Sequence, residues 1–383
     1  MELIHDLPAV FESFAEQRKN SFLAVKRLKE QGIPVVGTFC TYLPQELILA
    51  AGAATVGLCS MSDETVGEAE KVLPRNLCPL IKSSYGFAKT DKCPFFYFSD
   101  LIIGETTCDG KKKMYEYLGE FKPVYVMELP NVQSEAGLVL WKKEMFRLKA
   151  VLEEKLETEI TDEKLQKAIH LKNEERTALK ELSYLMALDP APMLGQDLFK
   201  VLFGSGYQFD KAASIASIKQ VTQSIRQQYK DGKRLERRPR ILVTGCPMGG
   251  ATEKVIQAIE ANGGVVVGFE NCSGMKSIDR NVDETNPDLY GALAERYLST
   301  GCSCMSPNPN RYELLGRMID DFKVDAVVDM ILQACHTYNV ETFGIKRFVN
   351  EEKGIPYMSV ETDYSQSDVG QLNTRMAAFV EML

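Results

Sequence analysis

The amino-acid sequence predicts an α/β protein with two similar doubly wound domains, each built on a parallel sheet. Short apolar runs alternate with helix-periodic segments near the N-terminus, the same alternation returns near the C-terminus, and a charged, helix-periodic stretch separates them. At 383 residues the chain is also too long for one compact core. We therefore expect an N-terminal α/β domain with leading helices at 1–145, a helical linker or bundle at 146–238, and a C-terminal α/β domain at 239–383.

Short apolar runs in both halves predict buried strands, because each is bounded by turn residues and followed by a helical pattern. The expected strands cover residues 33–39, 54–59, 100–106 and 123–128 in the first half, and 240–244, 265–270, 325–332 and 356–361 in the second. Strands that alternate with helices are typical of a parallel sheet with crossover helices. The two sets of four follow the same order, which indicates an internal repeat.

Cysteines follow corresponding strands in the two halves. The matching cysteines are Cys40 and Cys246, Cys59 and Cys272, and Cys108 and Cys335. Between the second and third of these matched positions lie Cys78 in the first half and Cys302 and Cys304 in the second. Doubly wound sheets bind ligands at the carboxyl ends of their strands. We therefore expect these cysteines to face a cleft between the domains rather than a core.

Composition narrows the classes of function. The net charge of −8 lacks the basic footprint of a nucleic-acid-binding protein. No apolar run approaches the roughly 18 residues that cross a bilayer, and the first 20 residues lack the order of a signal peptide. We expect a cytoplasmic protein. In a reducing cytoplasm, ten cysteines against three histidines favour metal or thiol chemistry over disulfides, with small buried hydrophobes as the alternative.

Several of the cysteines precede a predicted helix, where the dipole and the unpaired amides favour the thiolate. Cys78 and Cys246 are each followed by proline, and Cys108 stands before Asp109, which we expect to be a helix N-cap. The lysine run 111–113 is expected to form a solvated face. Soft thiolates select zinc, copper(I) or iron–sulfur clusters. Paired C-x-x-C knuckles are absent, so dispersed single cysteines favour a cluster, with zinc as the alternative.

Other motifs are missing or ambiguous. The sequence has no GxxxxGK[ST], so we do not expect it to hydrolyse ATP itself, and GCPMGG does not match a dinucleotide fingerprint. Acidic residues near the strand ends could relay protons or could only cap and hydrogen-bond. They are Glu46, Glu105, Glu361 and Asp363, and none is assigned as a general acid.

Six stretches together resemble the 2-hydroxyacyl-CoA dehydratase/benzoyl-CoA reductase subunit family. They are GTFCTYLPQE, NLCPLIKSSYG, ETTCDGKKKMYEY, GCPMGG, QACHTY and ETDYSQSDVGQLNTR. The resemblance covers nearly the whole chain and is strongest to the single-subunit branch called double-cubane cluster proteins. It implies two flavodoxin-like domains with a cluster in the cleft between them, and electrons delivered by a separate ATP-hydrolysing iron–sulfur activator.

The resemblance also implies the cluster ligands. Three cysteines carry over by motif as ligands of a first 4Fe–4S cubane: Cys78, Cys108 and Cys335. The remaining cysteines exceed what one cubane requires, so we expect a second cubane, joined to the first in an 8Fe–9S cluster. Its expected ligands are Cys40, Cys246 and one of Cys302 and Cys304, with Cys272 in reserve. Cys59 and Cys93 are expected to be structural.

Three functions follow. The first is an iron–sulfur reductase of small molecules with a double cubane, which we expect to be a homodimer. The second is a 2-hydroxyacyl-CoA dehydratase subunit with one cubane, a lyase component that pairs with a paralogous chain. The third is a non-catalytic electron carrier. The cysteine surplus favours the first over the second, and the sequence does not identify the substrate.

Overall fold

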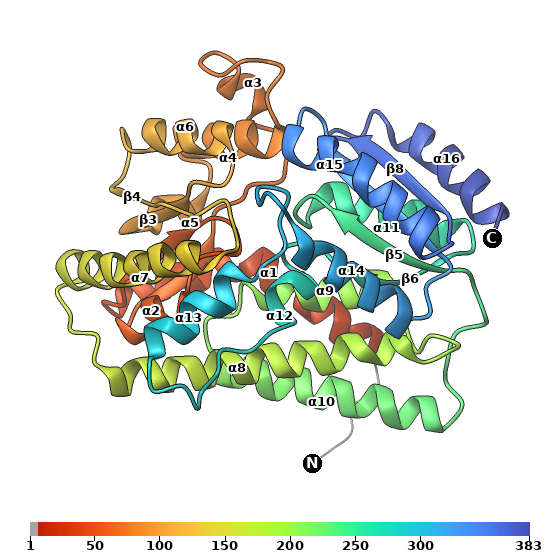
Figure 1. Ribbon diagram of the computed structural model, residues 1–383, viewed down its shortest axis with the longest axis horizontal. Helices are drawn as coiled ribbons and strands as arrows, with labels where there is room; N and C mark the ends of the chain where they lie inside the picture. The colour runs from red at the N-terminus through yellow and green to blue at the C-terminus, as the bar shows by residue number, and fades with distance from the viewer. Residues whose placement is uncertain (1–6) are drawn as a thin grey trace. The chain divides into compact units, whose positions relative to one another are not determined.

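The computed structural model describes residues 7–383 and divides into two compact units. The first-sheet unit comprises Lys19–Arg176 and Arg280–Asn310. The second-sheet unit comprises the residues up to Arg18, Thr177–Asp279 and Arg311–Leu383. Figure 1 shows the course of the chain through both, and each is described here by itself. None of the helices in the described residues is both long and apolar enough to cross a bilayer.

The first-sheet unit holds four parallel strands in the order β2-β1-β3-β4. The strands are β1 (Val35–Thr38), β2 (Ala54–Gly57), β3 (Leu101–Glu105) and β4 (Val124–Met127). The helices that begin in this part of the chain are α2 (Gln45–Ala50), α3 (Val66–Ala69), α4 (Pro79–Lys89), α5 (Pro94–Phe98), α6 (Asp109–Leu118), α7 (Glu135–Leu156), α8 (Asp162–Tyr184), α13 (Leu289–Leu298) and α14 (Pro309–Asp321). The central strands β1 and β3 are buried throughout, as expected of strands covered on both faces.

The second-sheet unit repeats this arrangement, with the order β6-β5-β7-β8. Its strands are β5 (Arg240–Gly245), β6 (Val265–Phe269), β7 (Ala326–Leu332) and β8 (Tyr357–Thr362). Its helices are α1 (Leu7–Glu30), which continues into the first-sheet unit, η1 (Leu185–Ala187), α9 (Gly195–Ser205), α10 (Lys211–Lys230), α11 (Gly250–Ala261), α12 (Met275–Ile278), α15 (His336–Arg347), the π-helical turn η2 (Phe348–Glu352) and α16 (Val369–Glu381). All eight predicted strands are present within two residues of their expected bounds, so two similar flavodoxin-like domains are confirmed.

The compact units differ from the contiguous ranges 1–145, 146–238 and 239–383 expected from the sequence. Residues 146–238 are helical, but Arg280–Asn310 leaves the C-terminal range and joins the first-sheet unit. The cause is packing of α13 against α7 (Figure 1). The rings of Phe146 and Tyr290 stack there with their centroids 4.3 Å apart, and Lys142 forms an ion pair with Asp288.

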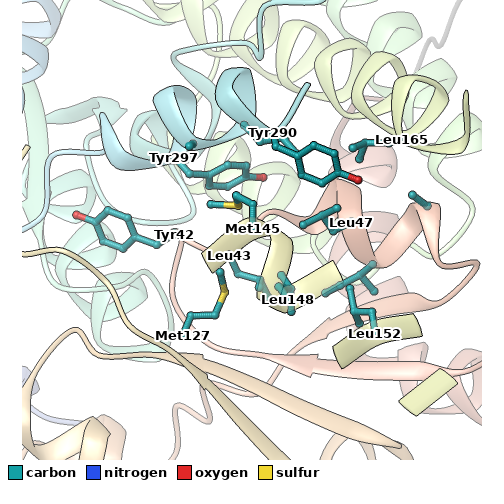
Figure 2. Packing of buried hydrophobic residues seen from close by; sticks show 14 of the residues in the cluster. Tyr42, Leu43, Leu47, Met127, Met145, Leu148, Leu152, Leu165, Tyr290 and Tyr297 are labelled. Carbon is teal, nitrogen blue, oxygen red and sulfur yellow. The ribbon is translucent and has the colours of Figure 1, made fainter. Parts of the chain in front are cut away.

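The core of the first-sheet unit includes this returning segment. Apolar side chains of α2, α7 and α13 gather in one buried cluster (Figure 2). Leu47, Met145 and Leu148 are fully buried, and Tyr297 is 4% exposed. Burying such side chains stabilises the fold by about 1.5–3 kcal/mol each. The loop that follows α13 and carries two cysteines is therefore attached to the core of the first-sheet unit.

Candidate functional site

Three cysteines stand at the N-termini of helices. Cys78, Cys108 and Cys335 are the N-cap residues of α4, α6 and α15, and none of their thiols accepts a capping hydrogen bond. The amides and the dipole of a helix N-terminus favour a thiolate at this place. Cys108 and Cys335 follow the equivalent strands β3 and β7, as the repeat predicts.

Cys93 uses its sulfur differently. It is also an N-cap residue, of α5, but its thiol accepts a hydrogen bond from the amide of Phe96 at 3.4 Å. Burial raises the pKa of this thiol. A buried, protonated thiol that caps a helix has a structural role, which agrees with the interpretation of Cys93 from sequence.

A buried lysine lies between two cysteines of the first-sheet unit. The Nζ of Lys111 is 3.1 Å from the Sγ of Cys40 and 3.7 Å from the Sγ of Cys59, and the residue is only 5% exposed. Burial alone would lower the pKa of Lys111, but the charges of Cys40 and Cys59 outweigh it and raise that pKa well above its usual value. The raised pKa favours the ammonium form of Lys111, which lies in contact with sulfur.

The backbone of Cys40 is strained. Its φ is +55°, in the left-handed region that a β-carbon disfavours. Ala334, which precedes Cys335 in the other unit, has a φ of +54°. Strain of this kind costs about 1–3 kcal/mol and persists mainly at functional sites. The loops after β1 and β7 are thus held in shapes that fold stability alone does not favour.

The loop after α13 adds two cysteines to the first-sheet unit. The thiol of Cys304 lies 3.9 Å from the hydroxyl of Tyr42. A hydrogen bond with the thiol of Cys302, and then burial, raise the pKa of Cys304. The charge of Cys40 acts on Cys304 as well. Cys302 and Cys304 lie in the C-terminal half of the sequence, and the structure brings them near Cys40, with which the sequence analysis groups one of them as a ligand.

Two acidic groups of the first-sheet unit hold protons. Burial raises the pKa of Glu105, the last residue of β3, to about 8, although the ammonium of Lys111 and the amide of Leu43 partly offset this rise. No side chain of residues 7–383 hydrogen-bonds to either of its carboxylate oxygens. Burial also raises the pKa of Tyr115 well above its usual value. Both groups are therefore neutral at pH 7.

Glu46 has a different environment. Burial would raise the pKa of this carboxyl, but the charges of Arg176 and Lys172 outweigh burial and lower it. Glu46 forms a buried ion pair with Arg176 and accepts a hydrogen bond from the Tyr297 hydroxyl at 2.7 Å. It is a structural anion rather than a proton relay.

In the second-sheet unit, Cys246 follows β5 and is fully buried. Its sulfur accepts a hydrogen bond from the amide of Leu332 at 3.3 Å, and its carbonyl oxygen accepts one from Asn271 Nδ2 at 2.6 Å. The thiol of Cys335 lies 3.8 Å from the hydroxyl of Thr337. Cys272 lies in the turn after β6 and is partly exposed. Cys246 does not cap α11, because that helix begins four residues later with Gly249 as its N-cap.

The predicted ligands are thus distributed over both units. Cys40, Cys78, Cys108, Cys302 and Cys304 belong to the first-sheet unit, and Cys246, Cys272 and Cys335 belong to the second. Within residues 7–383, no three His, Cys, Asp or Glu side chains stand close enough to hold a single metal ion. The individual ligand assignments remain predictions.

Sequence reasoning missed Lys111 and misassigned Asp109. Cys108 is the N-cap of α6, and Asp109 is its first helical residue, with its carboxylate 2.8 Å from Lys112 Nζ. Lys111 was expected on a solvated face with its two neighbours. Lys111, Met114, Tyr115 and Leu118 are the buried residues of α6, and this i, i+3, i+4, i+7 spacing was readable from the sequence.

Comparisons with known proteins find dehydratase subunits as relatives over nearly the whole chain. The family model described as "2-hydroxyglutaryl-CoA dehydratase, D-component" matches residues 40–383. The chain is 59% identical, over the full length of both proteins, to a protein of Escherichia coli (strain K12) named "Putative dehydratase subunit YjiM". It is 26% identical to the (R)-phenyllactyl-CoA dehydratase beta subunit of Clostridium sporogenes over 97% of each chain. It is 24% identical to the lactoyl-CoA dehydratase subunit beta of Anaerotignum propionicum, over 92% of this chain and 93% of that one.

Proposed function

We propose, from the premise that this chain belongs to the 2-hydroxyglutaryl-CoA dehydratase D-component family, that it is an iron–sulfur enzyme component that reduces small molecules with low-potential electrons. The relatives are named dehydratase subunits, so the chain is a dehydratase-like enzymatic component. An ATP-hydrolysing iron–sulfur activator is the proposed electron source. We further propose a homodimer in the cytoplasm and a double-cubane cluster.

The observation that carries the proposal is the gathering of thiols in the first-sheet unit. Cys40 contacts Lys111, whose charge environment also includes Cys59 and Cys108. The thiols of Cys302 and Cys304 hydrogen-bond to each other near Cys40. Thiolates are the ligands of iron–sulfur clusters, and a buried cation beside them favours the charged form. The donor set therefore fits a cluster. It also exceeds the three cysteines of a single cubane, which supports a second one.

The residues around these thiols have distinct roles in the proposal. Cys78, Cys108 and Cys335 would hold the first cubane, and Cys40, Cys246 and one of Cys302 and Cys304 the second, with Cys272 in reserve. When bound, such a cluster supplies electron transfer at low potential. Lys111 keeps a positive charge at the sulfur of Cys40. Glu105 and Tyr115 each keep a proton within the same unit, at an oxygen that is closed to bulk water.

The relatives favour a second candidate. Those whose names state a substrate are beta subunits of acyl-CoA dehydratases, so this chain would then be the single-cubane subunit of such an enzyme. In that case a paralogous chain should co-purify with it. The first candidate is instead a homodimer, which would have twice the chain mass of 42.9 kDa and contain one kind of chain only.

Iron and acid-labile sulfide per chain, measured after purification without oxygen, separate these candidates. About eight irons with slightly more sulfide are expected for the double cubane. About four irons would return the chain to the single-cubane dehydratase, and zinc in place of iron would overturn both. In the same preparation, Cys108→Ala should lose iron, while Cys93→Ser, which keeps a capping atom on α5, should not.

A further inference from the structure

Cys40 and Cys59 stand in matching positions just after the neighbouring strands β1 and β2. In the parallel pair β1 and β2, Thr38 lies opposite Gly57, and the amide of Leu58 donates to the carbonyl oxygen of Thr38 at 2.9 Å. Each cysteine comes two residues after its member of this pair. The two cysteines therefore lie at the same edge of the sheet, where β1 and β2 end. The ammonium of Lys111 contacts both of their sulfurs.

Lys111 needs a counter-charge, because an ammonium that loses its water on burial is unfavourable unless an opposite charge pairs with it. Within residues 7–383, no ion pair joins Lys111 to a carboxylate, whereas its neighbours Lys112 and Lys113 pair with Asp109 and Glu116. The remaining contacts are the two thiols and the face of the Phe39 ring, whose centroid is 5.1 Å from Nζ. The sulfurs of Cys40 and Cys59 are therefore the acidic groups that hydrogen-bond to this ammonium.

The repeat supplies an internal comparison. Tyr338, three residues after Cys335, occupies the position that Lys111 holds three residues after Cys108. A different buried lysine, Lys276, reaches the Tyr338 hydroxyl at 2.9 Å, and this lysine has a carboxylate partner, Glu270, at 3.1 Å. The second-sheet unit thus pairs its buried lysine with a carboxylate. In the first-sheet unit, cysteines stand where a carboxylate would be expected.

We propose that Cys59 is a metal-binding thiolate alongside Cys40, and that Lys111 is the shared counter-ion of this pair. The inference rests on the proposed iron–sulfur function and gives Cys59 a place among the three ligands of the second cubane. Lys111 acts through the sulfurs and is a positioning residue. Its fixed positive charge stabilises the added negative charge of a reduced cluster, so it raises the reduction potential.

The test uses the full-length protein purified without oxygen. Cys59→Ala should lose as much iron per chain as Cys40→Ala, whereas Cys93→Ser should keep the wild-type amount. Lys111→Met should shift the midpoint potential of the bound cluster to a more negative value, as followed by electron paramagnetic resonance. Lys111→Arg, which keeps the charge, should shift the potential much less.

The outcomes separate this inference from the proposed function. A wild-type protein without iron would overturn the iron–sulfur function itself. A wild-type protein with iron, together with a full iron content in Cys59→Ala or equal potentials in Lys111→Met and Lys111→Arg, would overturn this inference alone. Circular dichroism shows whether each variant is folded. If Lys111→Met does not fold, the iron content of Cys59→Ala decides.

Discussion

The hydroxyl of Tyr42 donates a hydrogen bond to the carbonyl oxygen of Thr300 at 2.9 Å. The two residues are far apart in sequence, one shortly after β1 and the other just after α13. The bond joins the loop that begins with Cys40 to the loop that carries Cys302 and Cys304. Two distant cysteine-bearing segments are thus fixed to each other within the first-sheet unit.

Tyr42→Phe should lower the free energy of unfolding by about 1 kcal/mol, because a buried hydrogen bond is lost while the ring remains. It should also speed alkylation of Cys302 and Cys304, since their loop loses an anchor. Urea unfolding and peptide mass spectrometry measure the two effects. Tyr97→Phe, at a 57% exposed tyrosine, is the control and should change neither. Equal alkylation rates in Tyr42→Phe and the wild type would contradict this role.

The core that holds the returning segment can be tested on one helix. Leu148 and Leu140 both belong to α7, but Leu148 is fully buried and Leu140 is 55% exposed. Leu148→Ala should cost about 2–5 kcal/mol of unfolding free energy, because it opens a cavity in the cluster of Figure 2. Leu140→Ala should cost less than about 0.5 kcal/mol. Similar losses in both variants would argue against the packing of α7.

Glu46→Gln should destabilise the protein by about 3–5 kcal/mol at pH 7, because it leaves the Arg176 guanidinium buried without its counter-charge. The lowered pKa of Glu46 sets the pH dependence. A carboxyl with a lowered pKa stabilises the folded state above its unfolded pKa of about 4.5, and this stabilisation fades as the pH falls through the folded value.

The difference between Glu46→Gln and the wild type should therefore be largest at neutral pH and shrink below about pH 4. Urea unfolding across this range measures it, with Glu154→Gln at an exposed position as the control. A difference that stays constant down to acid pH would show that lost packing, rather than charge, causes the destabilisation.

Glu105→Gln should have the opposite pH profile. Because its pKa is raised to about 8, the wild-type folded state holds a proton that the unfolded state releases above about pH 4.5. The wild type should therefore lose stability as the pH rises from about 4.5 to 8, relative to the variant. At pH 9 the variant should be more stable by on the order of 5 kcal/mol, and at pH 4.5 the two should be about equal.

Unfolding in urea at several pH values checks the Glu105 prediction. Glu120→Gln, at an exposed residue beyond the end of α6, should follow the wild type at every pH. If Glu105→Gln gains no stability relative to the wild type between pH 5 and 9, the buried carboxyl is not protonated at neutral pH.

The strands were predictable because their signal is local. An apolar run such as Ala326–Leu332 between turn residues has few alternatives to a buried strand, and the repeat supports each assignment twice. The N-cap positions of Cys78, Cys108 and Cys335 were also nearly readable, since each precedes a helix-periodic segment. The number of cysteines, ten in all, favoured metal or thiol chemistry.

The discontinuous unit was not predictable in this way. The packing of α13 against α7 depends on tertiary contacts between distant segments. Neither helix sequence indicates which helix it packs against. The neighbourhood of Cys40 and Cys304 has the same origin. Lys111 is a different case, because the helical spacing that buries it was present in the sequence. The two lysines beside it suggested a solvated face instead.

The interleaving of the two units limits how this protein can be divided. A fragment that ends at residue 238 would contain all four strands of the first sheet but would lack α13 and the loop with Cys302 and Cys304. The complementary fragment would keep a segment whose packing surface is missing. Although the two halves resemble duplicated modules, neither compact unit is encoded by one uninterrupted stretch of sequence. The two halves still share the same order of four strands, but the segments that connect these strands no longer keep the two units separate in sequence.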